Sequence, residues 1–559
     1  MKKWVCSALG LVLVLAVYAA DYRFPNWIHN ANESANNTVA FRCFHSQGKI
    51  EIAVSAECEG FSLFINNHEI KTKRFVSGGK YTLDISKYTV DGINSLQVLN
   101  VVPAGIEDAV KIHIPYPTVI AGKASKSEES AFALIDRIIR ADIEAGFPSA
   151  QLAVIKNGAL IYENAWNTTT ETLFDLASVT KMFSVNYALQ YLASRGEIAL
   201  DTRVVDILGA EFASESIDLD YPFEAFEKVP FEKQQELKQS ITVRDLLCHR
   251  AGMHPGPNYY SDRYDVETQT FDNDEPNKLY SGYGADETTR EETLRQIFRT
   301  PLLYAPRTAS LYSDVDYMLL GFIIEKITGK RLDVFLKETF FEPLGLHHIT
   351  YNPLEHGFEK SDCAPTDLSG NTNGGVLTFT GVREGVIQGE VHDAKAFYCM
   401  GGVSGHAGLF SNATDLAILA SVMLTGGWGD TMFFSQNVID AFCAPQDYIG
   451  ADYGLGWWRN AEAEWSRHFG TLASSRAIGH QGFTGTLVFI EPEQNLVIVY
   501  LTNKINTPLI KGKELQNQYE GGEMQAGIVG FVPQIVLLSE VGALGKTQQR
   551  AFLQSIQKK

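Results

Sequence analysis

The stretch that decides the fold is residues 178–192, SVTKMFSVNYALQYL. Its apolar residues recur as in a buried helix, and Gly196 follows as the expected stop. Ser178 stands at the first turn of this helix. Lys181 lies three residues further along the same face, where its amine can reach the Ser178 hydroxyl. The backbone N–H of Ser178 lies at the positive end of the helix dipole, which suits an oxyanion. The stretch therefore predicts a nucleophilic serine with an amine beside it.

The same Ser-x-x-Lys spacing occurs three more times, and the context of those copies excludes them. Ser46 and Ser77 stand in Gly-containing strand-and-turn sequence, and Ser555 lies among the last residues of the chain. None of the three opens an apolar helical run, so Ser178 is the candidate nucleophile.

A second string, Tyr312-Ser313-Asp314, directly precedes an apolar helical run that ends near Gly329. Tyr312 supplies a phenol that can accept and donate a proton. The other Tyr-Ser-Asp copy begins at Tyr260 and lies in a polar, acidic loop. Tyr312 is therefore the candidate proton carrier.

A third string, His480-Gln481-Gly482, precedes two apolar runs at residues 486–490 and 496–501. A Pro-Glu-Gln-Asn turn separates these runs, so they predict a β-hairpin of a central sheet, along which an acyl substrate can be held. The other His-x-Gly copy, at His406, lies in a Gly-rich loop.

The three strings together predict acyl transfer. A serine hydroxyl is a poor nucleophile until a base takes its proton, and the chain has no Gly-x-Ser-x-Gly elbow for this purpose. A buried lysine near a phenol and a second cationic group is expected to have a lowered pKa, which makes the neutral amine available. The predicted reaction passes through an acyl-serine and uses no metal or other cofactor.

The strings resemble the motifs of the serine penicillin-binding protein and class C β-lactamase family, which are Ser-x-x-Lys, Tyr-x-Asn/Asp and Lys/His-x-Gly. The likeness runs from about Gln151 to Asn503. Residues 312–318 together with Val391-His392-Asp393 are most similar to a periplasmic branch of D-alanyl-D-alanine carboxypeptidases. The resemblance implies an α+β fold in which an antiparallel sheet is flanked by helices and joined to a mainly helical lobe.

The resemblance also implies a role for each residue of the strings. Ser178 would be acylated, Lys181 would help to deprotonate it, and Tyr312 would pass the proton to the leaving amine. His480 would complete the electropositive cluster to which a lysine contributes in many relatives.

The substrate side of the implied site has two departures from the family pattern. The N–H groups of Ser178 and Phe483 would form the oxyanion hole, with Asp314, Gln481 and Gly482 beside the substrate. Asp314 stands where many relatives carry Asn, which leaves its contact to substrate open. His480 replaces Lys, which argues against a dedicated β-lactamase more than against activity.

The leading functional prediction is a D-alanyl-D-alanine carboxypeptidase-like hydrolase of peptidoglycan stem peptides, with β-lactams as covalent ligands. A carboxylic-ester hydrolase and a β-lactamase would use the same residues. A cell-wall binding protein with a retired active site is the alternative from another class. Intact Ser178, Lys181 and Tyr312 argue against it.

The net charge argues against some classes of partner, and the N-terminal residues predict the compartment of the protein. The 559 residues predict two or three domains, and the net charge of −19 argues against nucleic acid or an anionic membrane surface as a primary partner. Lys2 and Lys3 precede an uncharged stretch that ends at Ala20, which predicts a secretory signal and a periplasmic or extracellular protein. An uncleaved N-terminal anchor is the alternative.

The cysteines fit a secreted protein without requiring disulfides. Cys43 and Cys58 lie on neighbouring strand-like segments and can pair. The others beyond the signal are expected to be buried free thiols: Cys248, Cys363, Cys399 and Cys443.

The chain divides into five predicted segments. Residues 1–20 are the signal peptide, 21–120 an all-β, jelly-roll-like sandwich, 121–130 a linker, 131–520 the hydrolase domain and 521–559 a C-terminal extension. The sandwich is either a carbohydrate or cell-wall binding module or a spacer that positions the catalytic domain.

The hydrolase domain is expected to begin with a helix over residues 131–145. A hairpin around Asn157-Gly158 should follow it and share a sheet with the hairpin after His480.

Overall fold

The computed structural model describes most of the chain and divides it into two compact units. One unit is formed by residues up to Pro117 together with Gly426–Asn437, and the other by Thr118–Thr425 together with Val438–Lys559. The predicted signal peptide lies outside the described residues. The residues that the structure describes are 21–24, 38–44, 47–103, 106, 108–220, 226–271, 273–370, 377, 379–446, 454–460, 466–542 and 544–550.

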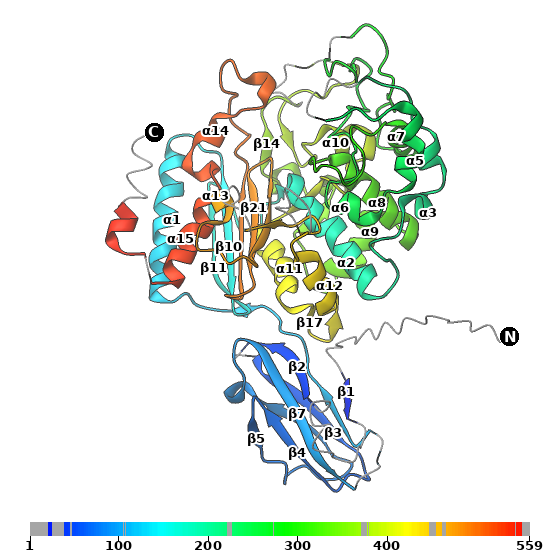
Figure 1. Ribbon diagram of the computed structural model, residues 1–559. Helices are drawn as coiled ribbons and strands as arrows, with labels where there is room; N and C mark the ends of the chain where they lie inside the picture. Colours follow the sequence, from blue (N-terminus) through cyan, green and yellow to red (C-terminus); the bar gives the residue numbers. More distant parts are fainter. Residues whose placement is uncertain are drawn as a thin grey trace, which may run out of the picture. The chain divides into compact units, whose positions relative to one another are not determined.

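The first unit is a sandwich of two four-stranded antiparallel sheets, as predicted (Figure 1). Alternate side chains of facing strands, such as Ile50 and Ile52 against Leu63 and Ile65, are buried between the sheets. One sheet has the order β1 (Asp21–Phe24), β8 (Val110–His113), β3 (Lys49–Val54), β6 (Lys80–Asp84). The other has the order β2 (Thr38–Cys43), β7 (Gly92–Val102), β4 (Gly60–Ile65), β5 (His68–Ile70).

The disulfide considered for this unit is not formed. Cys43 and Cys58 are both buried and both carry free thiols. Burial raises the pKa of the Cys43 thiol to about 11, so it behaves as a small apolar side chain.

A seven-stranded sheet forms the centre of the second unit, and both predicted hairpins belong to it. Asn157 and Gly158 have φ values of 47° and 70°, as the predicted two-residue turn requires. The sheet is antiparallel except where β9 runs parallel to β11. Its order is β19 (Trp458–Arg459), β20 (Ile478–Gly482), β21 (Thr486–Glu491), β22 (Leu496–Thr502), β10 (Ala150–Lys156), β11 (Ala159–Trp166), β9 (Ile120–Ala121).

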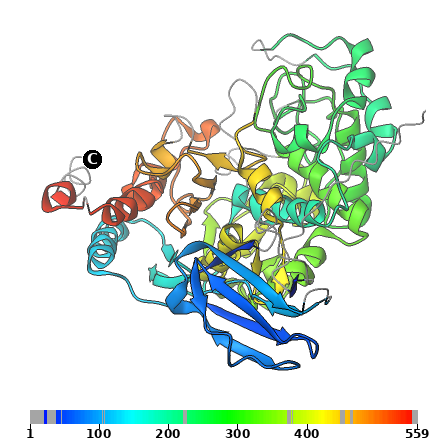
Figure 2. The ribbon, with the colours of Figure 1, turned by 60° about the horizontal axis from the view of Figure 1, so that its bottom comes forward.

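Helices α1 (Lys126–Glu144) and α15 (Phe531–Glu540) lie side by side on one face of this sheet (Figures 1 and 2). Their apolar side chains share one core with the sheet, so α15 is an integral part of the unit. Helix α1 begins at Lys126 and not at Ala131, because Ser125 and Glu128 form a capping box within the predicted linker.

The other face of the sheet meets helix α11 (Ala413–Thr425) and a mainly helical lobe. The lobe contains α8 (Asp314–Thr328), which ends at a left-handed Gly329 as predicted. The run from Ser178 to Ser194 is helical without a break, as predicted, but its hydrogen-bonding pattern changes along the way. A 3-10 turn (Ala177–Val179), a π-helical segment (Met182–Asn186) and α2 (Tyr187–Ser194) follow one another. None of the helices in the described ranges is long and apolar enough to cross a membrane.

Candidate active site

Ser178 lies on a tight turn between β12 (Phe174–Asp175) and the helical run. Its neighbour Ala177 has a φ of 46°, a left-handed conformation that costs a non-glycine residue energy. The Asp175 carboxylate stabilises this turn by accepting a 2.8 Å hydrogen bond from the Ala177 N–H. The backbone next to the nucleophile is therefore strained at Ala177, and the Asp175 carboxylate holds it in that conformation.

The central sheet approaches this turn so closely that one position admits no side chain. A Cβ atom at Gly482 would lie 2.3 Å from the Leu176 carbonyl oxygen and 2.2 Å from Thr486 Oγ1. Thr486 donates a 2.9 Å hydrogen bond to the same carbonyl, and Thr484 donates one of 2.7 Å to the Asp175 carbonyl. Thr484 and Thr486, which follow the third string, therefore hold the Ser178 turn against the end of β20.

Lys181 is fully buried and makes the contact predicted from its spacing to Ser178. Its Nζ lies 3.1 Å from Ser178 Oγ, 2.9 Å from Asp314 Oδ1 and 3.2 Å from the His406 carbonyl oxygen. An ammonium group has three N–H donors, so it suits a site with several acceptors.

The pKa of Lys181 is raised, which corrects the expectation that it is lowered. Burial alone lowers this pKa, but the charge of Asp314 and the Tyr312 hydroxyl outweigh burial. The carboxylate of Asp314, which comes from a distant segment of the chain, reverses the expected direction. At neutral pH the resting site therefore holds Lys181 as an ammonium ion.

Tyr312 lies two residues before α8, with its ring centroid 4.8 Å from Lys181 Nζ. The His249 ring packs against it at 4.5 Å, and His249 Nδ1 accepts a 3.1 Å hydrogen bond from the Ser313 N–H. Burial raises the pKa of Tyr312, while the charge of Lys181 lowers it. The phenol therefore carries its proton in the resting site.

His480 does not supply the positive charge expected of it. Its side chain is buried, and burial together with the charge of Lys181 lowers its pKa to about 3. Its Nδ1 contacts the Gln481 carbonyl at 2.7 Å, and its Nε2 has no hydrogen-bond partner among the described residues. The ring packs 4.6 Å from Trp458 and 6.2 Å from Tyr312, so His480 acts as a neutral packing group.

Asp314 is engaged by two ammonium groups. Oδ1 faces Lys181, and Oδ2 lies 3.2 Å from Nζ of Lys395. These two cations hold the pKa of Asp314 well below its usual range despite burial. The carboxylate thus belongs to an ion-pair network that engages both of its oxygens, and Asp314 is not among the residues that line the cleft described below.

Sequence reasoning missed Lys395 and the role of Asp393. Lys395 stands two residues after the quoted Val391-His392-Asp393 string, which was the only available signal. Lys395 Nζ also lies 3.5 Å from Asp393 Oδ2, and Asp393 Oδ1 lies 2.8 Å from His406 Nε2.

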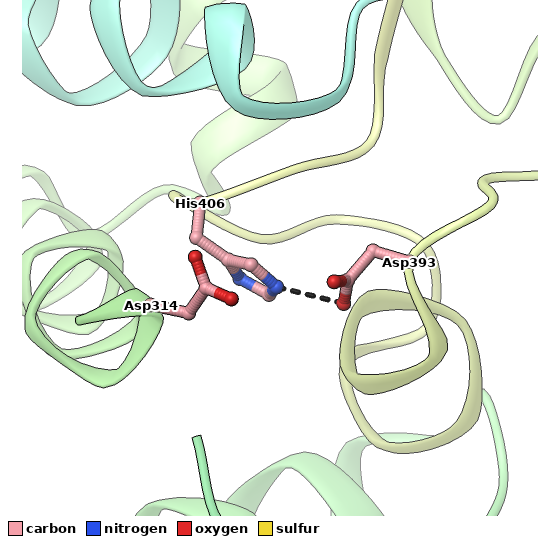
Figure 3. Close-up of side chains that lie close together, drawn as sticks. All are labelled: Asp314, Asp393 and His406. Atoms are coloured by element: carbon pink, nitrogen blue, oxygen red, sulfur yellow. Dashed lines mark hydrogen bonds and ion pairs between the residues drawn. The ribbon is translucent and has the colours of Figure 1, made fainter. Parts of the chain in front are cut away.

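Asp314, Asp393 and His406 bring ligand atoms within 4.8 Å of one another, as a metal site would (Figure 3). The contacts do not fit a cation. Both oxygens of Asp314 face ammonium groups, and Asp393 pairs with Lys395 and His406. A divalent ion would have to displace two positive charges from its own ligands, so we assign the cluster to ion pairing.

A cleft of about 410 Å³ opens above the nucleophile. Ser178, Tyr312, Gln481, Gly482 and Phe483 line it, which places five of the predicted site residues around one cavity. The residues that sequence reasoning missed include Trp458, Lys504, Asn517, Gln518, Tyr519 and Glu523.

Comparison with known proteins agrees with this arrangement. The Beta-lactamase family model matches residues 135–517. A protein of Escherichia coli K12 named "Putative D-alanyl-D-alanine carboxypeptidase" is 39% identical over 417 residues, which are 71% of this chain and 88% of that protein. A protein of Bacillus subtilis named "N-acetylmuramyl-L-alanine amidase" is 38% identical over 433 residues, 74% of this chain and 90% of its own.

Solved structures show the same fold at low identity. A penicillin-binding protein homologue from Caulobacter crescentus has a TM-score of 0.51 at 17% identity, covering 76% of this chain and 100% of its own. EstCE1, a hydrolase with promiscuous acyltransferase activity, has a TM-score of 0.51 at 19% identity, covering 75% and 100%. The chain belongs to the β-lactamase and penicillin-binding protein family of serine hydrolases.

Proposed function

We propose that the protein hydrolyses an amide bond near a free carboxylate, as at the D-alanyl-D-alanine end of a peptidoglycan stem peptide. The observation that carries this proposal is Lys504, which lines the same cleft as Ser178. Within the described part of the chain, no carboxylate lies within ion-pair distance of its amine, and burial lowers its pKa. A bound carboxylate would pair with this ammonium and offset the cost of its burial, whereas a neutral ester would gain nothing there.

The site residues account for two-step acyl transfer. Ser178 Oγ attacks the scissile carbonyl as its proton passes to the Lys181–Tyr312 pair. The N–H groups of Ser178 and Phe483 are the candidate donors to the oxyanion, each contributing about 2.7–4 kcal/mol. Tyr312 then gives a proton to the leaving amine, and water hydrolyses the acyl-serine by the same path in reverse. Since Lys181 and Tyr312 are both protonated at rest, the rate should rise as the pH becomes alkaline.

The test is release of D-alanine from a diacetyl-L-lysyl-D-alanyl-D-alanine peptide, compared with its C-terminal amide. The wild-type protein should release D-alanine from the acid, and Ser178→Ala should abolish release. Ser130→Ala, an exposed serine on α1, is the matched control. Intact-mass spectrometry with a penicillin should show an adduct on the wild type and none on Ser178→Ala. Absence of both D-alanine and adduct would refute the proposal.

A second candidate is cleavage between N-acetylmuramic acid and L-alanine. It rests on the Bacillus subtilis relative, whose name states that activity. Digestion of purified muropeptides followed by mass spectrometry separates the two. A carboxypeptidase shortens the peptide by D-alanine, whereas an amidase releases the whole peptide from the sugar. Fast cleavage of simple esters with neither product would instead favour the carboxylic-ester hydrolase, and rapid turnover of the penicillin adduct a β-lactamase.

Either substrate requires export. We propose that residues 1–20 are a cleaved signal, on the basis of Lys2, Lys3 and the uncharged stretch that follows. N-terminal sequencing of the protein purified from its native compartment tests this. A sequence starting at Met1 would instead indicate an uncleaved anchor.

A further inference from the structure

A row of alternating charges runs from the nucleophile into the helical lobe. Lys181 pairs with Asp314 at 2.9 Å, Asp314 with Lys395 at 3.2 Å, and Lys395 with Asp393 at 3.5 Å. Asp393 pairs with His406 Nε2 at 2.8 Å. Figure 3 shows the His406 ring between the carboxylates of Asp314 and Asp393. We call the four residues Lys181, Asp314, Lys395 and Asp393 the charge row.

The charge row is shielded from solvent along its length. The side chain of Lys181 is 0% exposed, that of Lys395 13% and those of Asp314 and Asp393 22% and 26%. Charges so poorly screened act on one another more strongly than surface ions do. The two cations and two carboxylates balance, so removing one of them leaves a net charge beside Ser178.

We propose that Lys395 is a positioning residue for acyl transfer. Its ammonium shares the Asp314 carboxylate with Lys181, and in this way it sets the pH at which the Lys181–Tyr312 pair can accept the proton of Ser178. The inference rests on the acyl-serine chemistry of the family and not on which substrate is proposed.

Electrostatics gives the direction in which each charge of the row changes the proton affinity of Lys181. Without Lys395, Asp314 would act on Lys181 alone and hold its proton more tightly. Without the charge of Asp393, Lys395 would turn its full charge toward Asp314, and Lys181 would release its proton more easily. The directions are the same if Tyr312 is the group that accepts the proton, because added negative charge also raises the pKa of a phenol.

Several other titratable groups around the row have pKa values shifted away from the neutral range. The pKa of His254, which faces Lys395, is lowered to about 3 by burial and by that lysine. Burial likewise lowers the pKa of His249 well below its usual range. Burial raises the pKa of three more groups that Lys395 influences. The pKa is raised to about 12 for Tyr264 and Cys399, and it is raised further for Tyr259. Tyr260, Tyr317, His406 and His480 also face residues of the row.

The test uses p-nitrophenyl acetate, an ester that reports acylation of Ser178 whatever the natural substrate is. Its kcat/KM is measured from acidic to alkaline pH for the full-length protein and three variants. Lys395→Met should move the midpoint of the rising limb up by about one pH unit and lower the rate below the midpoint about tenfold. Asp393→Asn, which keeps the cap of α10 (Ala394–Met400), should move the midpoint down. Lys395→Arg should restore a profile near that of the wild type.

Lys233→Met, at a lysine that is 59% exposed, is the matched control and should leave the profile unchanged. A merely structural role for Lys395 predicts loss of activity without opposite shifts in the two variants. Midpoints that coincide with the wild type, or that move the same way in both variants, would overturn the inference. If Lys395→Met does not fold by circular dichroism, a midpoint for Asp393→Asn that is unchanged or raised overturns it alone. Failure to release D-alanine, by contrast, would leave this result untouched.

Discussion

Lys181 Nζ and Asp314 Oδ1 form a 2.9 Å ion pair beside the nucleophile. An amide would leave the lysine free to lose its proton when buried. The carboxylate instead raises the pKa of Lys181 and lowers its own. One side-chain oxygen therefore changes the resting state of the whole site.

Asp314→Asn should reverse this effect. The amide keeps a hydrogen bond to Lys181 but removes the charge, so the pKa of Lys181 should fall. The midpoint of the pH dependence of kcat/KM should then move to lower pH by about one unit or more. A pH titration of ester hydrolysis measures it, with the exposed Asp220→Asn as control. A midpoint that stays in place or rises would show that Asp314 does not control the proton of Lys181.

Asp314→Leu should behave differently, because it leaves two buried ammonium groups without their carboxylate. Loss of one partner from a buried pair costs about 3–5 kcal/mol of folding free energy. We expect a clear drop in Tm for Leu and a smaller one for Asn. Thermal unfolding of both variants and of the wild type at neutral pH measures the differences, and a Tm of Asp314→Leu equal to that of the wild type would argue that the pair adds nothing to stability.

Gly482→Ala should disturb the nucleophile without touching its chemistry. The added Cβ would lie 2.3 Å from the Leu176 carbonyl, so the Ser178 turn must shift. We expect kcat to fall at least about tenfold, since small misplacements of reacting groups cost about that much or more. Gly522 lines the same cleft, and a Cβ there would meet nothing within 4 Å. Gly522→Ala is therefore the control, and equal kcat in both variants would contradict the argument.

The local parts of the site were predictable from the sequence. Lys181 is three residues from Ser178, so helical spacing alone brings them together, and the Asn157-Gly158 turn was visible as a dipeptide. The start of α1 was readable too, because Ser125 and Glu128 spell a capping box. Apolar periodicity alone places the start of the helix later, at Ala131.

The rest depended on contacts between distant segments. Nothing near Lys395 in the sequence indicates that it meets Asp314, which lies in another helix of the lobe. The protonation states were unpredictable for the same reason. The pKa of Lys181 rises and that of His480 falls because of which buried charges surround each of them, and only the folded chain fixes those neighbours.

His480 should make the protein less stable in acid. Its pKa is about 3 when folded and about 6.5 when unfolded, so the unfolded chain binds the proton first. Stability is therefore full above about pH 6.5 and falls as the pH drops toward 3. His480→Gln should flatten this part of the Tm–pH curve, whereas the exposed His356→Gln should leave it unchanged. Parallel curves for His480→Gln and the wild type would show that His480 is protonated without cost.

Lys504 should make the enzyme prefer a peptide with a free C-terminal carboxylate over the same peptide with a neutral C-terminal amide. If its ammonium pairs with a substrate carboxylate, Lys504→Met should raise KM for the peptide acid about tenfold or more and leave the C-terminal amide unaffected. Ester hydrolysis reports Ser178 directly and should keep its kcat. Steady-state kinetics with the three substrates measure this, and Lys504→Arg should retain the preference for the acid. Equal losses on acid and amide would mean that Lys504 supports the cleft without recognising charge, and the case for a carboxylate-bearing substrate would then fail while acyl transfer at Ser178 stood.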